Sequence, residues 1–228
     1  MALSTKVERF GQGSSTVLAL KSDTRNKDYA VKATATDERG DIIARDLAGL
    51  RESPSAEYTV KASGNLSLSL GAVNTVSSTV YCLLGLNITT SAASAPKVTL
   101  SGESLQTGAT VSSTIDLGDI ALSVRHKAQI LCAAFTLSGT GCKLTECSLD
   151  VKANLTRATV DGETLAHDVS GATFSVKGTV VQTGATVPTI TAAEGWTLNT
   201  PTSEENPDEA HTTWTFELTK DLTSAEPA

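Results

Sequence analysis

Apolar and polar residues alternate along much of this chain, with the period of two that is typical of strands buried on one face. Residues 16–20 predict a first short strand. Residues 28–37 alternate more clearly and predict a half-buried strand that ends at an Arg39-Gly40 turn. The opening part of the chain therefore favours β-structure.

The pattern is ambiguous over residues 42–52. Ile43, Leu47 and Leu50 recur at the spacing of a short helix. A similar segment later in the chain, residues 164–169, instead has the pattern of a strand that follows a hairpin turn. We expect a strand followed by a charged loop or helical turn that reaches Pro54, and the choice between helix and strand over 42–52 stays open.

Strand signals dominate from residue 58 onwards. Residues 58–70 predict a hairpin around Ser63-Gly64-Asn65, and residues 80–88 predict a strand with its apolar side chains on one face. Short strands separated by turn signals are typical of a sandwich or barrel. The sequence therefore predicts an all-β fold, an antiparallel β-sandwich or barrel. Further strands are expected at 98–101, 114–117, 120–124, 129–135, 148–153, 157–160, 164–169, 173–182, 196–199 and 211–219.

Several short segments recur in the same order. Four pairs match: Val31-Lys32-Ala33 with Val151-Lys152-Ala153, 44–49 with 166–171, 58–62 with 174–178, and 96–99 with 188–191. Self-similarity in a fixed order favours one structural unit used twice, although short matches also arise by chance in a chain this rich in Ser and Thr. We expect two similar β-units from internal duplication, with Val31, Ala44 and Val60 equivalent to Val151, Ala166 and Val176.

This repeat predicts a domain organisation. An N-terminal arm and first strand occupy 1–27, and the first β-unit occupies 28–105, with an extra uncharged hairpin at 63–95. Connecting strands fill 106–146, and the second β-unit occupies 147–220. Residues 221–228 contain too little apolar surface to pack and are expected to form a flexible tail.

Composition narrows the possible partners. The formal net charge is −7, and only 4% of residues are aromatic. A surface that binds phosphate needs clustered Lys and Arg, so sequence-specific nucleic-acid binding is not expected. The N-terminus has no charged-then-apolar signal pattern, and the apolar runs are too short and too polar for a membrane span.

A long stretch without charge separates Lys61 from Lys97. One interpretation of this stretch is an ordinary buried hairpin. The alternative is a protein–protein interface, because charged residues are depleted at the centre of such surfaces. We take the second interpretation and expect a subunit interface formed by Ser78, Thr79, Val80, Tyr81, Leu83, Leu84 and Leu86.

No set of residues predicts catalysis, a cofactor or a metal. His167 and Asp168 are adjacent, so on a strand they point to opposite faces and cannot pair. The cysteines, Cys82, Cys132, Cys142 and Cys147, lack the four convergent ligands of a zinc site and are expected to be small buried hydrophobes. We therefore expect no enzymatic activity and no cofactor.

In its general composition and strand pattern, the whole chain resembles tailed-bacteriophage virion structural proteins, and the tail-tube family in particular. The resemblance lies in an acidic β-protein rich in Ser, Thr, Ala and Gly, with few aromatic residues and no signal peptide. The resemblance implies β-sandwich domains that form homo-oligomeric rings, in which the sheets of neighbouring subunits join into an inner barrel. It also implies that the rings stack through long loops and that DNA passes through the lumen. It also implies contacts with other virion proteins and location in the virion after assembly in the host cytoplasm. The flanking helix of that family has only residues 43–50 as a candidate.

Two alternatives remain. Within the same class, the chain could be a capsid decoration or head-attachment protein. From another class, it could be a carbohydrate-binding or adhesin module, for which exposed aromatic side chains are expected. Trp196 and Trp214 are the only tryptophans, and Trp214 is predicted to be buried.

Overall fold

The regular secondary structure of the described residues consists of β-strands alone, in a computed structural model. This confirms the all-β prediction. The structure describes residues 7–105, 109–124, 134–160, 163–184, 186–205 and 210–223. The strands are β1 (Leu18–Thr36), β2 (Ile42–Val60), β3 (Gly64–Leu70), β4 (Val73–Val76), β5 (Thr79–Ser91), β6 (Lys97–Leu105), β7 (Thr110–Val111), β8 (Ile115–Leu122), β9 (Phe135–Ser138), β10 (Cys142–Val160), β11 (Glu163–Gln182), β12 (Thr189–Ala192), β13 (Thr197–Leu198), β14 (Thr202–Glu205) and β15 (Thr212–Thr223).

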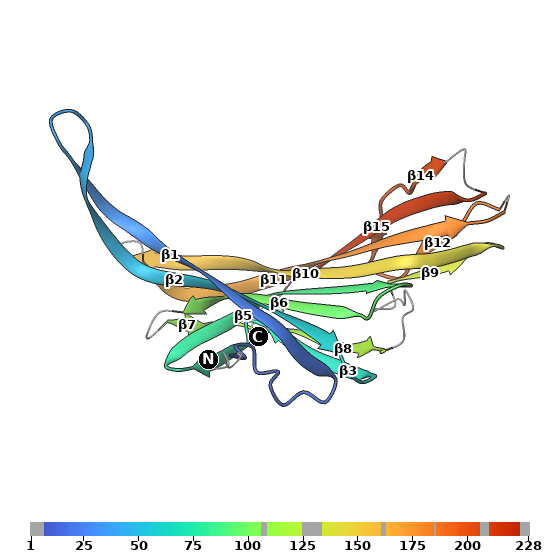
Figure 1. The fold of residues 1–228 in the computed structure, drawn as a ribbon, viewed down its shortest axis with the longest axis horizontal. Helices are drawn as coiled ribbons and strands as arrows, with labels where there is room; N and C mark the ends of the chain where they lie inside the picture. Colours follow the sequence, from blue (N-terminus) through green and yellow to red (C-terminus); the bar gives the residue numbers. More distant parts are fainter. Residues whose placement is uncertain are drawn as a thin grey trace, which may run out of the picture.

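One large sheet dominates the molecule, with the order β1-β2-β6-β5-β10-β11-β15-β13 (Figure 1). The pairings along it are antiparallel, and the short β7 adds a parallel pairing to β11. Two small sheets, β3–β8 and β9–β12, pack against the large one. The arrangement is sandwich-like, as predicted. Because β5 pairs with β10, both predicted β-units contribute strands to a single sheet.

The core lies between the large sheet and the small ones. Strands β2, β6, β5, β10, β11 and β15 each place one side chain in a single cross-strand row, and no member of that row is more than 1% exposed. Side chains from β3, β8, β9 and β12 complete the same cluster. Burying such side chains contributes about 1.5–3 kcal/mol each. The row consists of Tyr58, Val98, Ile88, Leu149, Val176 and Leu218.

A two-stranded arm projects from one edge of the large sheet (Figure 1). β2 pairs with β6 only over residues 55–59, so from residue 54 back to residue 42 its only described partner strand is β1. We call residues 28–51 the arm, and residues 23–27 with 52–56 its root. At about 3.3 Å per residue, the hairpin extends roughly 40 Å beyond the last pairing with β6.

The structure corrects three sequence predictions. Residues 42–52 form a continuous strand, with no loop or helical turn, because they pair with β1 along their whole length. Residues 58–70 are not a hairpin, since β2 pairs with β1 and β6 whereas β3 pairs with β8. Residues 221–223 belong to β15 and pair with β11, so the predicted tail begins too early. The other tail residues lie outside the described part of the chain.

The proposed internal repeat maps onto two long hairpins, β1–β2 and β10–β11. Val31 lies on β1 and Val151 on β10, which are the first strands of the two hairpins. Their cross-strand partners are not equivalent, however. Val31 pairs with Leu47, whereas Val151 pairs with Phe174, five residues beyond the counterpart of Leu47. The hairpins share an order but not a register, and internal duplication stays a prediction.

Candidate functional site

The predicted subunit interface lies on β5 and on the turn that precedes it. Tyr81, Leu83 and Leu86 are 3%, 3% and 1% exposed within the chain's own core. They are buried because β5 is an interior strand, flanked by β6 and β10 and also by β4. These three residues therefore cannot form a subunit interface, and the uncharged stretch behaves here as core. For Ser78, Thr79, Val80 and Leu84, which are exposed or half-buried, an interface role stays a prediction.

A β-bulge explains why the apolar alternation on β5 is misleading. Leu83 pairs with Gly102 and Gly85 pairs with Ser101, so Leu84 has no partner and the alternation shifts by one residue. Beyond the bulge, Leu86 shares a face with Leu83 rather than with Leu84. A bulge inserts one residue and reverses which face the following side chains occupy.

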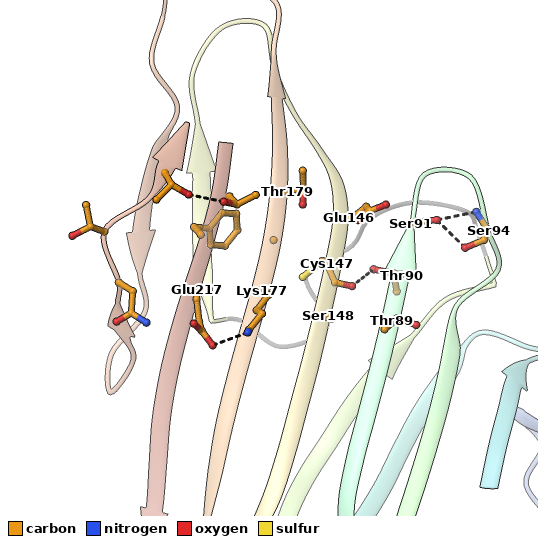
Figure 2. A pocket seen from close by; sticks show the side chains of 16 residues that line it. Thr89, Thr90, Ser91, Ser94, Glu146, Cys147, Ser148, Lys177, Thr179 and Glu217 are labelled. Carbon is orange, nitrogen blue, oxygen red and sulfur yellow. Dashed lines mark hydrogen bonds and ion pairs between the residues drawn. The ribbon is translucent and has the colours of Figure 1, made fainter. Parts of the chain in front are cut away.

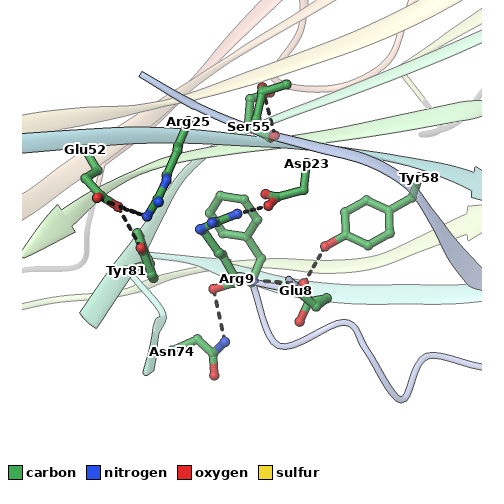
Figure 3. A network of polar contacts seen from close by, with 11 residues as sticks. Glu8, Arg9, Asp23, Arg25, Glu52, Ser55, Tyr58, Asn74 and Tyr81 are labelled. Atoms are coloured by element: carbon green, nitrogen blue, oxygen red, sulfur yellow. Dashed lines mark hydrogen bonds and ion pairs between the residues drawn. The ribbon is translucent and has the colours of Figure 1, made fainter. Parts of the chain in front are cut away.

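An ionic network around the buried carboxylate of Glu52 holds the root of the arm (Figure 3). The Glu52 carboxylate accepts a 2.7 Å hydrogen bond from the Tyr81 hydroxyl, and it lies 3.2 Å from Arg25 Nη1 and 3.2 Å from Lys27 Nζ. Burial alone would raise the pKa of Glu52. The hydrogen bonds from Tyr81 and Lys27 and the nearby charges outweigh burial and lower the pKa below its ordinary value.

The N-terminal segment joins this network on its other side. Arg9 forms an ion pair with Asp23, and their side chains are 8% and 9% exposed. The Arg9 guanidinium also lies over the Tyr81 ring, 5.5 Å from its centroid. The neighbouring Glu8 accepts a hydrogen bond from the Tyr58 hydroxyl. Burial, followed by the hydrogen bond and charge of Glu8, raises the pKa of Tyr58 well above its usual range.

A second ionic cluster surrounds Glu103 on β6. Arg157 donates to both Glu103 oxygens, at 3.3 and 2.7 Å, and His167 Nε2 lies 3.7 Å from Oε1. Burial and the Glu103 charge raise the pKa of the nearby Cys82 thiol to about 11. A thiol nucleophile needs a lowered pKa and access to solvent. The Cys82 side chain has neither property, so it is not suited to act as a nucleophile.

The pair His167 and Asp168 lies as the sequence predicted. His167 is 0% exposed, whereas Asp168 faces solvent and accepts hydrogen bonds from Ser112 and Ser113. The two side chains thus occupy opposite faces of β11. Of the cysteines, Cys82 and Cys147 are buried as expected and Cys142 is half-buried, while Cys132 lies outside the described residues.

A groove of about 700 Å³ lies on the face of the large sheet opposite the core (Figure 2). Two cross-strand rows of polar side chains form its floor. The only cation among the lining residues, Lys177, lies 3.4 Å from Glu217, and Ser175 also donates to this carboxylate. The rows are Ser91, Glu146, Thr179 and Thr215, and Thr89, Ser148, Lys177 and Glu217.

Aromatic side chains contribute little to this groove. Phe216, its only aromatic lining residue, is 4% exposed and packs edge-on against Phe135 at 4.7 Å. Trp214 is half-buried rather than fully buried, donates to Gln182, and does not line the groove. The groove therefore presents hydroxyl groups, two carboxylates and one paired ammonium group, but no open aromatic face.

Sequence reasoning did not identify the ionic residues that the fold brings together. Asp23, Glu52, Glu103 and Arg157 are ordinary charged residues in strands, and no local pattern marks them as buried. Across the described ranges, no group of three or more His, Cys, Asp or Glu side chains has the arrangement of a metal site. No described helix is long and apolar enough to cross a membrane.

Comparison with known proteins gives no assignment. No protein-family model matches the chain, and no curated protein matches its sequence.

Proposed function

We propose that this chain is a structural virion protein that self-assembles into a phage tail tube or a related ring-like assembly. The observation that carries the proposal is the arm. An isolated two-stranded hairpin is at best marginally stable in water and needs a further surface to pack on. Within the described residues, no strand other than the arm's own two pairs with residues 28–51. A neighbouring subunit supplies the missing surface.

The tip of the arm is suited to a polar contact that also buries apolar surface. Asp37 accepts hydrogen bonds from the backbone N–H groups of Arg39 and Asp41, which fixes the turn. Ile42 and Ile43 follow the turn and are 52% and 66% exposed. Covering the two isoleucines would contribute about 1–2 kcal/mol each. Exposed isoleucines at the end of a projecting hairpin favour a protein partner.

Charge complementarity favours a second copy of the chain as that partner. Residues 37–41 contain three acidic residues and one arginine. The other end of β2 leads into the exposed Lys61, and β6 begins beside it with the exposed Lys97. An acidic tip and a basic opposite end are arranged for head-to-tail contact. Repeated head-to-tail contacts give rings that close or filaments that stay open.

The two edges of the large sheet provide a lateral contact. β1 pairs only with β2 among the described strands, so no described strand pairs with its outer edge. At the far edge, β13 and β14 cover β15 only over residues 218–219 and 212–215. Open edges are templates for pairing with another chain. Joining such edges would build a closed ring, and the polar groove face would then line one side of the wall.

Removing the arm tests the proposal. Lys27 pairs with Glu52, so replacing residues 28–51 by Asn-Gly closes the hairpin with a two-residue turn. The shortened chain should keep the near-UV circular dichroism of the full chain but remain monomeric in sedimentation, whereas the full chain should sediment as larger assemblies. A matched control removes charge elsewhere: Glu194→Gln should still assemble. Unchanged assembly without the arm, or a full chain that is monomeric at every concentration, contradicts the proposal.

A carbohydrate-binding module is the second candidate, favoured by the hydroxyl-lined groove. Hydroxyl and carboxylate side chains bind sugars by hydrogen bonds, but sugar-binding sites usually add an aromatic platform. With Phe216 covered, this groove lacks one. Titration with oligosaccharides would support this candidate if Lys177→Ala abolished a measurable heat of binding.

A further inference from the structure

The N-terminal segment crosses the root of the arm as a strap, which we define as residues 7–17. Each of its anchors reaches a different strand (Figure 3). Glu8 accepts from Tyr58 on β2, and the Arg9 carbonyl accepts from Asn74 on β4 at 3.0 Å. Phe10 is 7% exposed and lies above Gly102 on β6, where an added Cβ would be 2.8 Å from its ring. A few residues of strap thus connect several strands of the large sheet.

The strap also holds the arm, through one shared residue. Arg9 binds Asp23, which lies on β1 opposite Ala56, within the part of β2 that pairs with β6. The same guanidinium lies over Tyr81, whose hydroxyl donates to Glu52 on the other strand of the root. Arg9 therefore contacts one root strand directly and the other through Tyr81. Removing the strap would release both contacts at once.

The energetics of the strap favour reversible docking. Burying Phe10 contributes about 1.5–3 kcal/mol. Arg9 offsets part of this gain, because its charge is buried and its Nε–H has no hydrogen-bond acceptor in the described part of the chain. An unsatisfied buried donor costs about 1–3 kcal/mol, and a buried ion pair often contributes little net stability. The glycines at positions 11 and 13 join the anchors to β1 without stiff side chains.

We propose that the strap is a detachable clamp that fixes the direction of the β1–β2 arm, so that its release loosens the root while the rest of the sheet stays folded. The inference concerns the isolated chain and does not depend on what the chain assembles into. It gives the arm two states, a fixed one with the strap docked and a loose one with the strap free. A partner that displaces residues 7–17 would shift the arm between them.

Hydrogen exchange on the full chain, measured by mass spectrometry at monomeric concentration, tests the clamp. The variant is Arg9→Met, which keeps the length of the side chain and removes its charge. The matched control is Arg157→Met, which also leaves a buried carboxylate, Glu103, without its arginine, but on the opposite face of β6 from the strap residue Phe10. In Arg9→Met, amides of the strap and of both root strands should exchange at least about ten-fold faster, while amides of β15 opposite β11 keep their wild-type rates.

The control separates clamping from general loss of stability. Arg157→Met should leave root amides close to their wild-type rates relative to those of β15. If Arg9→Met fails to fold, Asn74→Ala removes only the hydrogen bond to the Arg9 carbonyl and should raise the same amide rates by about three-fold. The clamp is refuted if the strap exchanges faster while the root does not. It is also refuted if both arginine variants loosen the root equally.

Discussion

Shortening two leucines that are two positions apart on β5 tests the bulge and the core in one experiment. Simple alternation puts Leu84 and Leu86 on the same face. The bulge at Leu84 instead leaves Leu86 1% exposed, beside Leu100 and Val151, and leaves Leu84 half-buried. The same chemical change, Leu→Ala, should therefore have unequal effects on stability.

The expected magnitudes follow from burial. Leu86→Ala loses about 2–2.5 kcal/mol of transfer free energy, at about 0.8 kcal/mol for each buried methylene. The cavity left in a packed interior adds about 1 kcal/mol, so we expect a loss of about 3–4 kcal/mol. For Leu84→Ala we expect about 1–1.5 kcal/mol, because part of the side chain already contacts water and the site can relax.

Urea unfolding of the monomer, followed by the fluorescence of Trp196 and Trp214, measures both values. Equal slopes of free energy against denaturant would show that the variants change stability rather than the compactness of the unfolded state. A loss for Leu84→Ala equal to or greater than that for Leu86→Ala would refute the bulge and the core assignment of β5.

Three further predictions use polar and turn residues. Ser77 and Ser78 form a two-residue hairpin turn and both have positive φ, 49° and 68°, which Asn and Gly adopt more readily than Ser. Changing Ser77 to Asn and Ser78 to Gly should therefore raise the free energy of unfolding, measured in urea, by about 1 kcal/mol. The pKa of Glu52 is lowered in the folded state, so this carboxylate stabilises the fold above its unfolded-state pKa, and the stabilisation is lost as pH falls through the folded-state pKa. Glu52→Gln should therefore reduce the dependence of the melting temperature on pH at acid pH, and an unchanged dependence would contradict this. Because burial and Glu103 raise the pKa of Cys82 to about 11, iodoacetamide at neutral pH should alkylate the half-buried Cys142 before Cys82, as peptide mass spectrometry would show.

The fold class could be predicted from the sequence because alternation is a local signal. The pattern over residues 28–37 and the Arg39-Gly40 turn correctly indicated a strand that ends at a hairpin turn, and Gly40 has the positive φ that such a turn requires. Strand pairing is not local. Residues 58–70 have the alternation of a hairpin, yet β2 and β3 pair with strands distant in the chain. Alternation gives the faces of a strand but not its neighbours.

Charge depletion between residues 61 and 97 shows the limit of composition. An interior strand and a strand at a subunit interface both exclude charge, so the sequence does not distinguish them. In the structure β5 lies between β6 and β10, and its residues Tyr81, Leu83 and Leu86 are buried in the core. The arm has the opposite pattern. It is rich in charge, which suggested a loop near Pro54, yet it forms a long hairpin with which no other described strand pairs.

The ionic residues of the root could not be predicted for a related reason. Glu52 and Arg9 are far apart in sequence. Tyr81 contacts both of them, and only the topology of the large sheet brings it to that position. Buried charges are rare and are tolerated only where partners converge. No spacing rule in one sequence reports such convergence.

Electron microscopy of the purified full-length chain tests the central claim most directly. The proposal predicts rings or stacked tubes of uniform diameter, with an acidic arm tip of one subunit against the Lys61 and Lys97 end of the next. Charge reversal of those two lysines to glutamate should leave dispersed particles while the melting temperature stays within a few degrees of wild type. Dispersed monomers of the unaltered chain at high concentration would contradict self-assembly through the arm.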